Sequence, residues 1–225
     1  MRRWGLVMTL SYAVILLVFV APLTVLINLD KGSHTFVLEV TKVYQGGGVW
    51  LLTGIMAACQ ALLLFLSVDV SRQRLKPRSH ILLSCMVTAA MAALLCGSAI
   101  LSLGFGVFGD RFGRHFFDTS LPVFASWAGL WLAWGLIFLN YLRGSNASLT
   151  RITTRLLRGS VLELLIAVPS HVLARRRNDC SAPVATSFGI ATGIAIMLLC
   201  FGPSVLLLYK KRMDDYGKPR VAAAG

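Results

Sequence analysis

Acidic side chains are scarce in this chain of 225 residues, which has nine Asp and Glu against 22 Lys and Arg. Charged residues of either sign make up only 14%, whereas soluble domains carry about 25%. Together with 56% hydrophobic residues and a mean hydropathy of +0.74, this excludes an ordinary soluble domain and predicts a membrane protein. The basic residues form short clusters between apolar runs, a pattern typical of topology setting and of contact with anionic lipid headgroups.

Several chemical signatures are also missing. No C-x-x-C occurs, and only Cys180 of the five cysteines lies in a polar segment, which excludes a disulfide framework. The four histidines lie mostly near predicted loop ends with no pair in mid-span, so we expect neither haem nor another cofactor, and no metal site. A basic, aromatic-rich soluble module is absent, so nucleic acid is not expected as a partner.

Long apolar runs predict an all-α, polytopic transmembrane bundle of six helices, forming one domain over residues 1–212 and followed by a disordered cytoplasmic tail, 213–225. Residues 30–47, with a short interfacial turn, and residues 109–119 are expected to be loops. The spans are predicted at about residues 4–29, 49–68, 80–108, 120–142, 156–174 and 184–209.

The fifth run, 156–174, leaves an alternative open. At 1.5 Å per residue it measures about 28 Å, just enough for a hydrocarbon core of about 30 Å. If it crosses, both termini are cytoplasmic in the plasma (inner) membrane and most Lys and Arg lie inside, although the cluster Arg175 to Arg177 is then outside. The alternative is five spans plus one re-entrant or interfacial helix.

Polar and small residues share one face of the 156–174 helix. At 100° per residue, Ser170 and His171 fall within 80° of Glu163, together with Ser160, Ala167 and Ala174, and the opposite face is aliphatic. An unpaired carboxylate in lipid is costly, so this stripe should face the bundle interior or a wet cavity. Glu163 then either relays a proton or binds a cation with His171 as partner, or pairs structurally with Arg158 or another arginine.

A polar segment follows this helix and contains Arg175, Arg176, Arg177, Asp179 and Cys180. Guanidinium groups suit phosphate and carboxylate groups, so the segment either anchors to lipid headgroups or binds an anionic lipid or metabolite. The candidate functional cluster therefore comprises Glu163, Ser170, His171, Arg175, Arg176, Arg177, Asp179 and Cys180.

Two functional hypotheses follow. The first is a non-enzymatic protein, either carrying a small solute or proton or serving as a membrane partner subunit. Small-residue pairs such as Gly189 and Gly193 allow helix packing and association with another copy or protein. The alternative is a small membrane-embedded enzyme acting on a lipid-soluble substrate near residues 171–180, beside the aromatic face of 120–142. We favour the first, because no nucleophile, base or metal constellation has recognisable spacing.

Overall fold

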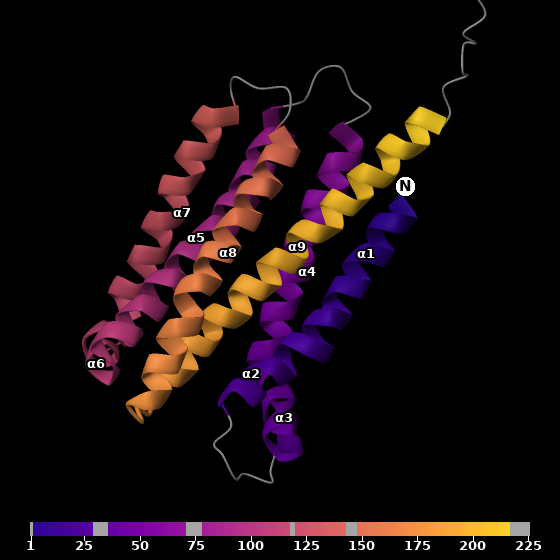
Figure 1. Ribbon diagram of the computed structural model, residues 1–225. Helices are drawn as coiled ribbons and strands as arrows, with labels where there is room; N and C mark the ends of the chain where they lie inside the picture. The colour runs from indigo at the N-terminus through magenta and orange to yellow at the C-terminus, as the bar shows by residue number, and fades with distance from the viewer. Residues whose placement is uncertain (1, 29–35, 71–77, 118–119, 143–147, 217–225) are drawn as a thin grey trace, which may run out of the picture.

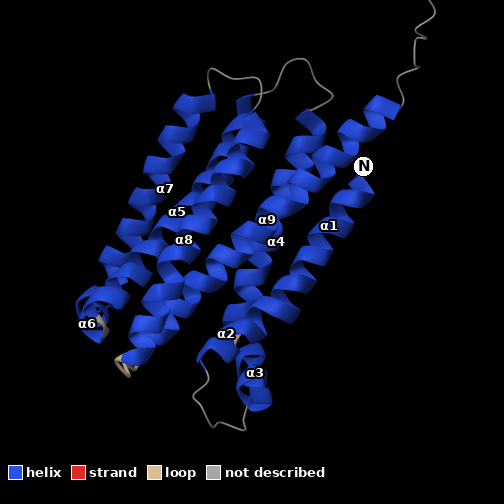
Figure 2. Ribbon diagram, viewed as in Figure 1, coloured by secondary structure: helices blue, strands red, loops and turns tan. Residues whose placement is uncertain are grey.

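The structure is a computed structural model that describes residues 2–28, 36–70, 78–117, 120–142 and 148–216. These residues form helices and short turns and contain no strand (Figure 2), which confirms the predicted all-α class. The elements are α1 (Arg2–Ile15), the π-helical turn η1 (Leu16–Val20), α2 (Ala21–Asn28), α3 (Phe36–Gln45), α4 (Gly47–Val70), α5 (Arg78–Phe108), α6 (Asp110–Phe117), α7 (Ser120–Leu142), α8 (Ser148–Arg176) and α9 (Ala182–Tyr216).

Five helical stretches within the described residues are long and apolar enough to cross a membrane. Helix α7 adds a shorter apolar stretch, Phe124–Asn140. The stretch in α8 includes the whole of the run 156–174, so this run has the length and composition of a span. The five stretches are Gly5–Ile27, Gly47–Leu64, Cys85–Phe108, Thr153–Arg176 and Ala182–Phe201.

The long helices lie side by side as a bundle, and α8 runs along α5 and α9 rather than across their ends (Figure 1). Helices α5 and α9 are the most enclosed, with 61% of their apolar stretches buried against 28% in the N-terminal stretch and in α4. The apolar core therefore centres on α5 and α9, and buried residues of α1, η1, α4, α7 and α8 complete it. Helices α1 and α4 flank α9 on one side, and α7 packs on α5.

The first stretch continues from α1 through the π turn into α2 without a break in the helix. A π turn adds one residue to the ladder and rotates the following face. Leu16 and Val20 of this turn are buried. One turn earlier, the Tyr12 hydroxyl donates to the Ala195 carbonyl of α9 over 2.9 Å, which ties this first stretch to the core.

Two segments predicted as loops contain helices, so those predictions were wrong over α3 and α6. Both helices are short and carry charged residues, so neither contains the long apolar run by which the spans were predicted. In α3, Glu39 accepts a hydrogen bond from Lys42 at 2.7 Å, an i,i+3 pair that supports helix formation. Helix α9 also runs to Tyr216, four residues into the predicted tail, and residues 217–225 lie outside the described residues.

The aromatic face of α7 packs against α5. The Trp131 indole donates to the Met86 carbonyl at 3.0 Å, and a Cβ placed on Gly97 would lie 3.2 Å from the Trp127 ring. Phe138 is only 2% exposed. These aromatic rings therefore fill space over α5, the ordinary role of large side chains at a helix contact.

Candidate functional site

The polar stripe of α8 faces the interior of the bundle, as its helical periodicity predicts. The side chains at the positions of the stripe are all buried, whereas Leu165, Val168 and Val172 on the opposite face are exposed. The functional role of the stripe stays a prediction. The buried stripe residues are Ser160, Glu163, Ala167, Ser170, His171 and Ala174.

Glu163 lies where three helices meet. Its side chain is 1% exposed, and its Oε1 atom is hydrogen-bonded to the hydroxyl of Ser98 on α5. Its Oε2 atom is buried without a hydrogen-bond partner. A Cβ placed on Gly193 of α9 would lie 3.2 Å from Oε2, so glycine there lets α9 approach the carboxyl group. Arg158, a candidate structural partner, is instead exposed.

The hydrogen bonds of Ser98 bear on whether the Glu163 carboxyl group is protonated. The Ser98 oxygen lies 2.7 Å from the Leu94 carbonyl and 3.1 Å from the Leu95 carbonyl, in addition to Glu163. A hydroxyl has one proton, and carbonyl oxygens only accept. When that proton goes to the backbone, the contact with Glu163 requires a proton on the carboxyl group. Two proton arrangements are therefore compatible with the same heavy-atom positions.

Further hydroxyl groups follow along the same seam between α5, α8 and α9. Ser102 lies one turn beyond Ser98, about 6 Å along the axis of α5, and its buried Oγ has no hydrogen-bond partner. It sits against Gly189 of α9. A Cβ on Gly106, one turn further, would lie 2.7 Å from the Ser170 hydroxyl of α8. Glycines thus admit hydroxyl groups at successive turns of a tightly packed seam.

His171 continues the stripe but does not pair with Glu163. Eight residues separate them on one helix, which is about 12 Å along its axis. The His171 Nδ1 atom instead lies 2.9 Å from the Thr186 hydroxyl of α9, and that hydroxyl donates to the Ala182 carbonyl at 2.9 Å. When the hydroxyl proton goes to the backbone, the Nδ1–H tautomer of His171 completes the pair as donor; with the other tautomer Nδ1 accepts from Thr186.

Helix α8 ends in a left-handed turn at Asn178, with φ of 56°. The backbone amides of Asn178 and Asp179 bond the carbonyls of Arg175 and Ala174, the pattern of a Schellman cap. From this end, the Arg177 guanidinium reaches the last turn of α5. It donates to the Val107 carbonyl at 3.1 Å and also to the Gly106 carbonyl, where a cation is favoured by the helix dipole.

Asp110, at the start of α6, caps the first turn of α9. Its carboxylate accepts from the backbone amides of Cys180 (2.8 Å), Ser181 (3.1 Å) and Ala182 (3.0 Å), and from the Ser181 hydroxyl at 2.8 Å. The backbone bond from Cys180 and the hydroxyl bond from Ser181 are the main reasons that the Asp110 pKa falls from 3.8 to about 2. Asp110, from the α5–α6 junction, thus caps the start of α9, and Arg177, from the α8–α9 turn, caps the end of α5.

Gly109 makes this junction sterically feasible. Its φ is +62°, which favours glycine, and a Cβ there would lie 2.8 Å from Oδ2 of Asp179. That Oδ2 atom is buried and has no hydrogen-bond partner. This oxygen of Asp179 is therefore enclosed beside the junction although the residue as a whole is half-buried, whereas Arg176 and Cys180 are exposed.

The structure separates the predicted cluster into three places. Glu163 lies at the middle of the three-helix seam, Ser170 and His171 lie further along it, and residues 175–180 form the turn at its end. Sequence reasoning missed Ser98 and Ser102 as neighbours of Glu163. Their i,i+4 spacing on an apolar helix was the available signal, but nothing local indicated which helix they face.

Comparison with known protein families, curated proteins and solved structures finds no match to this chain. The class of the protein therefore rests on its own fold. Five apolar helices of membrane-spanning length, three of which enclose a seam of buried polar groups, define a helical membrane protein.

Proposed function

We propose that this protein is a multi-pass membrane protein that carries a proton, with Glu163 as the group that takes up and releases it. The observation that supports this most directly is the buried Oε2 atom of Glu163, which has no hydrogen-bond partner. A bare carboxylate in such a place would cost several kcal/mol, so a proton on Glu163 offsets most of the penalty.

The surroundings supply a means of moving that proton. Ser98 can accept from a neutral Glu163 or donate to an ionised one, because its hydroxyl has backbone carbonyls as alternative acceptors. Ser102 and Ser170 continue the seam towards the α8–α9 turn, and Ser160 is buried on the other side of Glu163. Hydroxyl groups both donate and accept, which is what transfer between neighbours requires. Small shifts of the helices or a few waters would link them.

The proposed topology has six spans with both termini in the cytoplasm of the plasma (inner) membrane. The start of α1 and the end of α9 lie at the same end of the bundle (Figure 1), as an even number of crossings requires. One basic cluster, around residues 72–78, follows α4 in the sequence, and a second, residues 210–212, falls near the end of α9. The positive-inside rule assigns both clusters to the cytoplasm. The exposed Arg176 then contacts lipid headgroups at the outer surface.

Proton flux tests this proposal. Purified protein is reconstituted into liposomes containing a pH-sensitive dye, and a pH step is applied. Valinomycin and K⁺ are present so that a membrane potential does not build up and limit proton flux. We expect the dye response of the wild type to exceed that of empty liposomes, and Glu163→Gln to reduce the excess at least tenfold, because an amide cannot exchange a proton. Glu39→Gln, which removes an exposed carboxylate outside the seam, serves as the matched control.

Infrared difference spectroscopy gives a second measurement that does not depend on flux. The wild type should show a carboxylic acid C=O band at neutral pH that shifts in D₂O, and Glu163→Gln should lack it. Equal flux in the wild type and Glu163→Gln, or no difference in the acid band between them, would contradict the proposal.

A further inference from the structure

A cavity of about 800 Å³ lies on the side of α9 facing away from the Glu163 seam. It is bounded by the η1–α2 stretch, by α4 and by α9, with α3 at one end. Its volume falls within the roughly 300–1,000 Å³ of sites that hold small molecules. None of the described residues that line it belongs to α5 or α8, so it is separate from the proposed proton site.

The wall of the cavity is mostly apolar, and three of its hydroxyl groups are turned to their own helices. The hydroxyls of Thr24, Ser187 and Thr192 each donate to a carbonyl three or four residues earlier, so their protons are not directed at an occupant. An apolar space of this size forfeits many contacts if empty, and water finds few partners in it. The wall therefore suits a hydrocarbon body.

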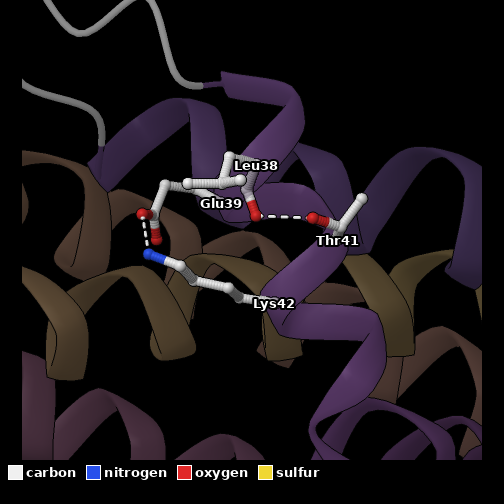
Figure 3. Close-up of polar contacts among 4 residues, drawn as sticks. All are labelled: Leu38, Glu39, Thr41 and Lys42. Carbon is white, nitrogen blue, oxygen red and sulfur yellow. Dashed lines mark hydrogen bonds and ion pairs between the residues drawn. The ribbon is translucent and has the colours of Figure 1, made fainter.

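Charge in the described part of the lining is confined to one end. Among the residues that the structure describes, Glu39 of α3 is the only charged one in the lining, and its carboxylate pairs with Lys42 at 2.7 Å (Figure 3). Both side chains are about half exposed, whereas Met56 and Ala195, elsewhere in the lining, are at most 3% exposed. The cavity thus runs between a wet, acidic end and a dry, apolar interior.

We propose that this cavity binds a lipid-soluble amphiphile, with its hydrocarbon chain between α4 and α9 and a hydroxyl or amine head at Glu39. The carboxylate has acceptor sites beyond the one that Lys42 uses, so it can take a hydrogen bond from the head. The site needs no part of the Glu163 seam, and its occupant enters from the membrane.

Two glycines of α4 allow a matched test. A Cβ placed on Gly48 or on Gly54 meets no atom within 4 Å, so both positions border open space. Gly48 lines the cavity and Gly54 does not. Gly48→Phe therefore narrows the site, and Gly54→Phe adds the same side chain elsewhere on the same helix.

The probe is a sixteen-carbon primary alcohol with a mid-chain diazirine, photolysed in phosphatidylcholine nanodiscs that hold the full chain. We expect saturable labelling of α4 and α9 peptides that unlabelled hexadecanol competes away and hexadecane does not. Gly48→Phe should reduce the labelling at least fivefold, and Gly54→Phe should leave it unchanged. Glu39→Leu should also reduce it, whereas Lys42→Leu, which keeps the carboxylate, should not.

Labelling that does not saturate, or that is equal in Gly48→Phe and Gly54→Phe, would overturn the proposal. It would show that the cavity is filled by the hydrocarbon of the bilayer and has no specific ligand. The variants also go through the liposome flux assay. Loss of labelling with normal proton flux supports two separate sites, so a failure of either proposal can be recognised independently of the other.

Discussion

At the scale of single residues, Asp110 shows how one carboxylate can hold two distant parts of the chain. It lies about 70 residues from the three backbone amides that it bonds, and helix N-termini favour a negative charge. Arg177 places a positive charge at the C-terminal end of α5 and donates to its last carbonyls. The two side chains satisfy helix ends that would otherwise lack partners where the chain turns.

Asp110→Ala should destabilise the protein by about 1 kcal/mol, the usual cost of losing a helix cap, and lower the Tm in detergent by about 2–4 °C at neutral pH. Because the folded pKa is depressed, the wild type keeps this stabilisation above pH 3.8 and loses it as the pH falls towards 2. The pH dependence within that window should therefore weaken in the variant. Arg111→Ala, at the exposed neighbouring residue, is the control, and an equal Tm in both variants would contradict this role.

At the scale of helices, glycine decides how closely α5, α8 and α9 approach. Gly106 meets Ser170, Gly189 meets Ser102, and Gly193 meets the Glu163–Leu164 pair. In a membrane, apolar side chains gain little by leaving lipid, so close backbone packing and interhelical hydrogen bonds hold helices together. The hydrogen bond between Ser98 and Glu163 depends on this approach.

Gly193→Val tests the packing of this seam. The added Cβ would lie 3.0 Å from Leu164 Cγ and 3.2 Å from the Glu163 carboxyl, and its methyl groups extend further, so overpacking should cost about 1–3 kcal/mol. Thermal unfolding in detergent measures the effect. Gly129→Val, on α7, is the matched control because a Cβ there meets nothing within 4 Å. Similar Tm values for the two variants would show that α8 and α9 are not in close contact at Gly193.

At the scale of the whole molecule, the orientation of α8 determines on which side of the membrane its ends lie. Its position along α5 and α9 is that of a bundle helix, and its apolar stretch is as long as those of its neighbours. The proposed six-span topology would place the turn with Cys180 on the outer side and the start of α8 inside.

A membrane-impermeant maleimide tests that topology. Cys180 is exposed, Cys85 and Cys200 are buried, and the half-buried Cys59 and Cys96 lie within apolar stretches that an impermeant reagent does not enter. Intact cells should therefore be labelled at Cys180, and labelling should vanish in Cys180→Ser. In that background, a cysteine introduced by Thr154→Cys, near the other end of α8, should react only after permeabilisation. Labelling of Cys180 that also requires permeabilisation would refute the six-span arrangement.

The sequence alone determined the helical class and the inward face of α8, because length, hydropathy and the 3.6-residue period are local properties. It did not reveal α3 and α6, since short helices with charged residues resemble loops. Nor did it identify what the inward face meets: Ser98 is 65 residues from Glu163 in sequence. Only the packing of α5, α8 and α9 decided that Glu163 has one partnered and one unpartnered oxygen, that Arg177 caps α5, and that a separate cavity lies beyond α9. These depend on distances between helices, which a helical period does not contain.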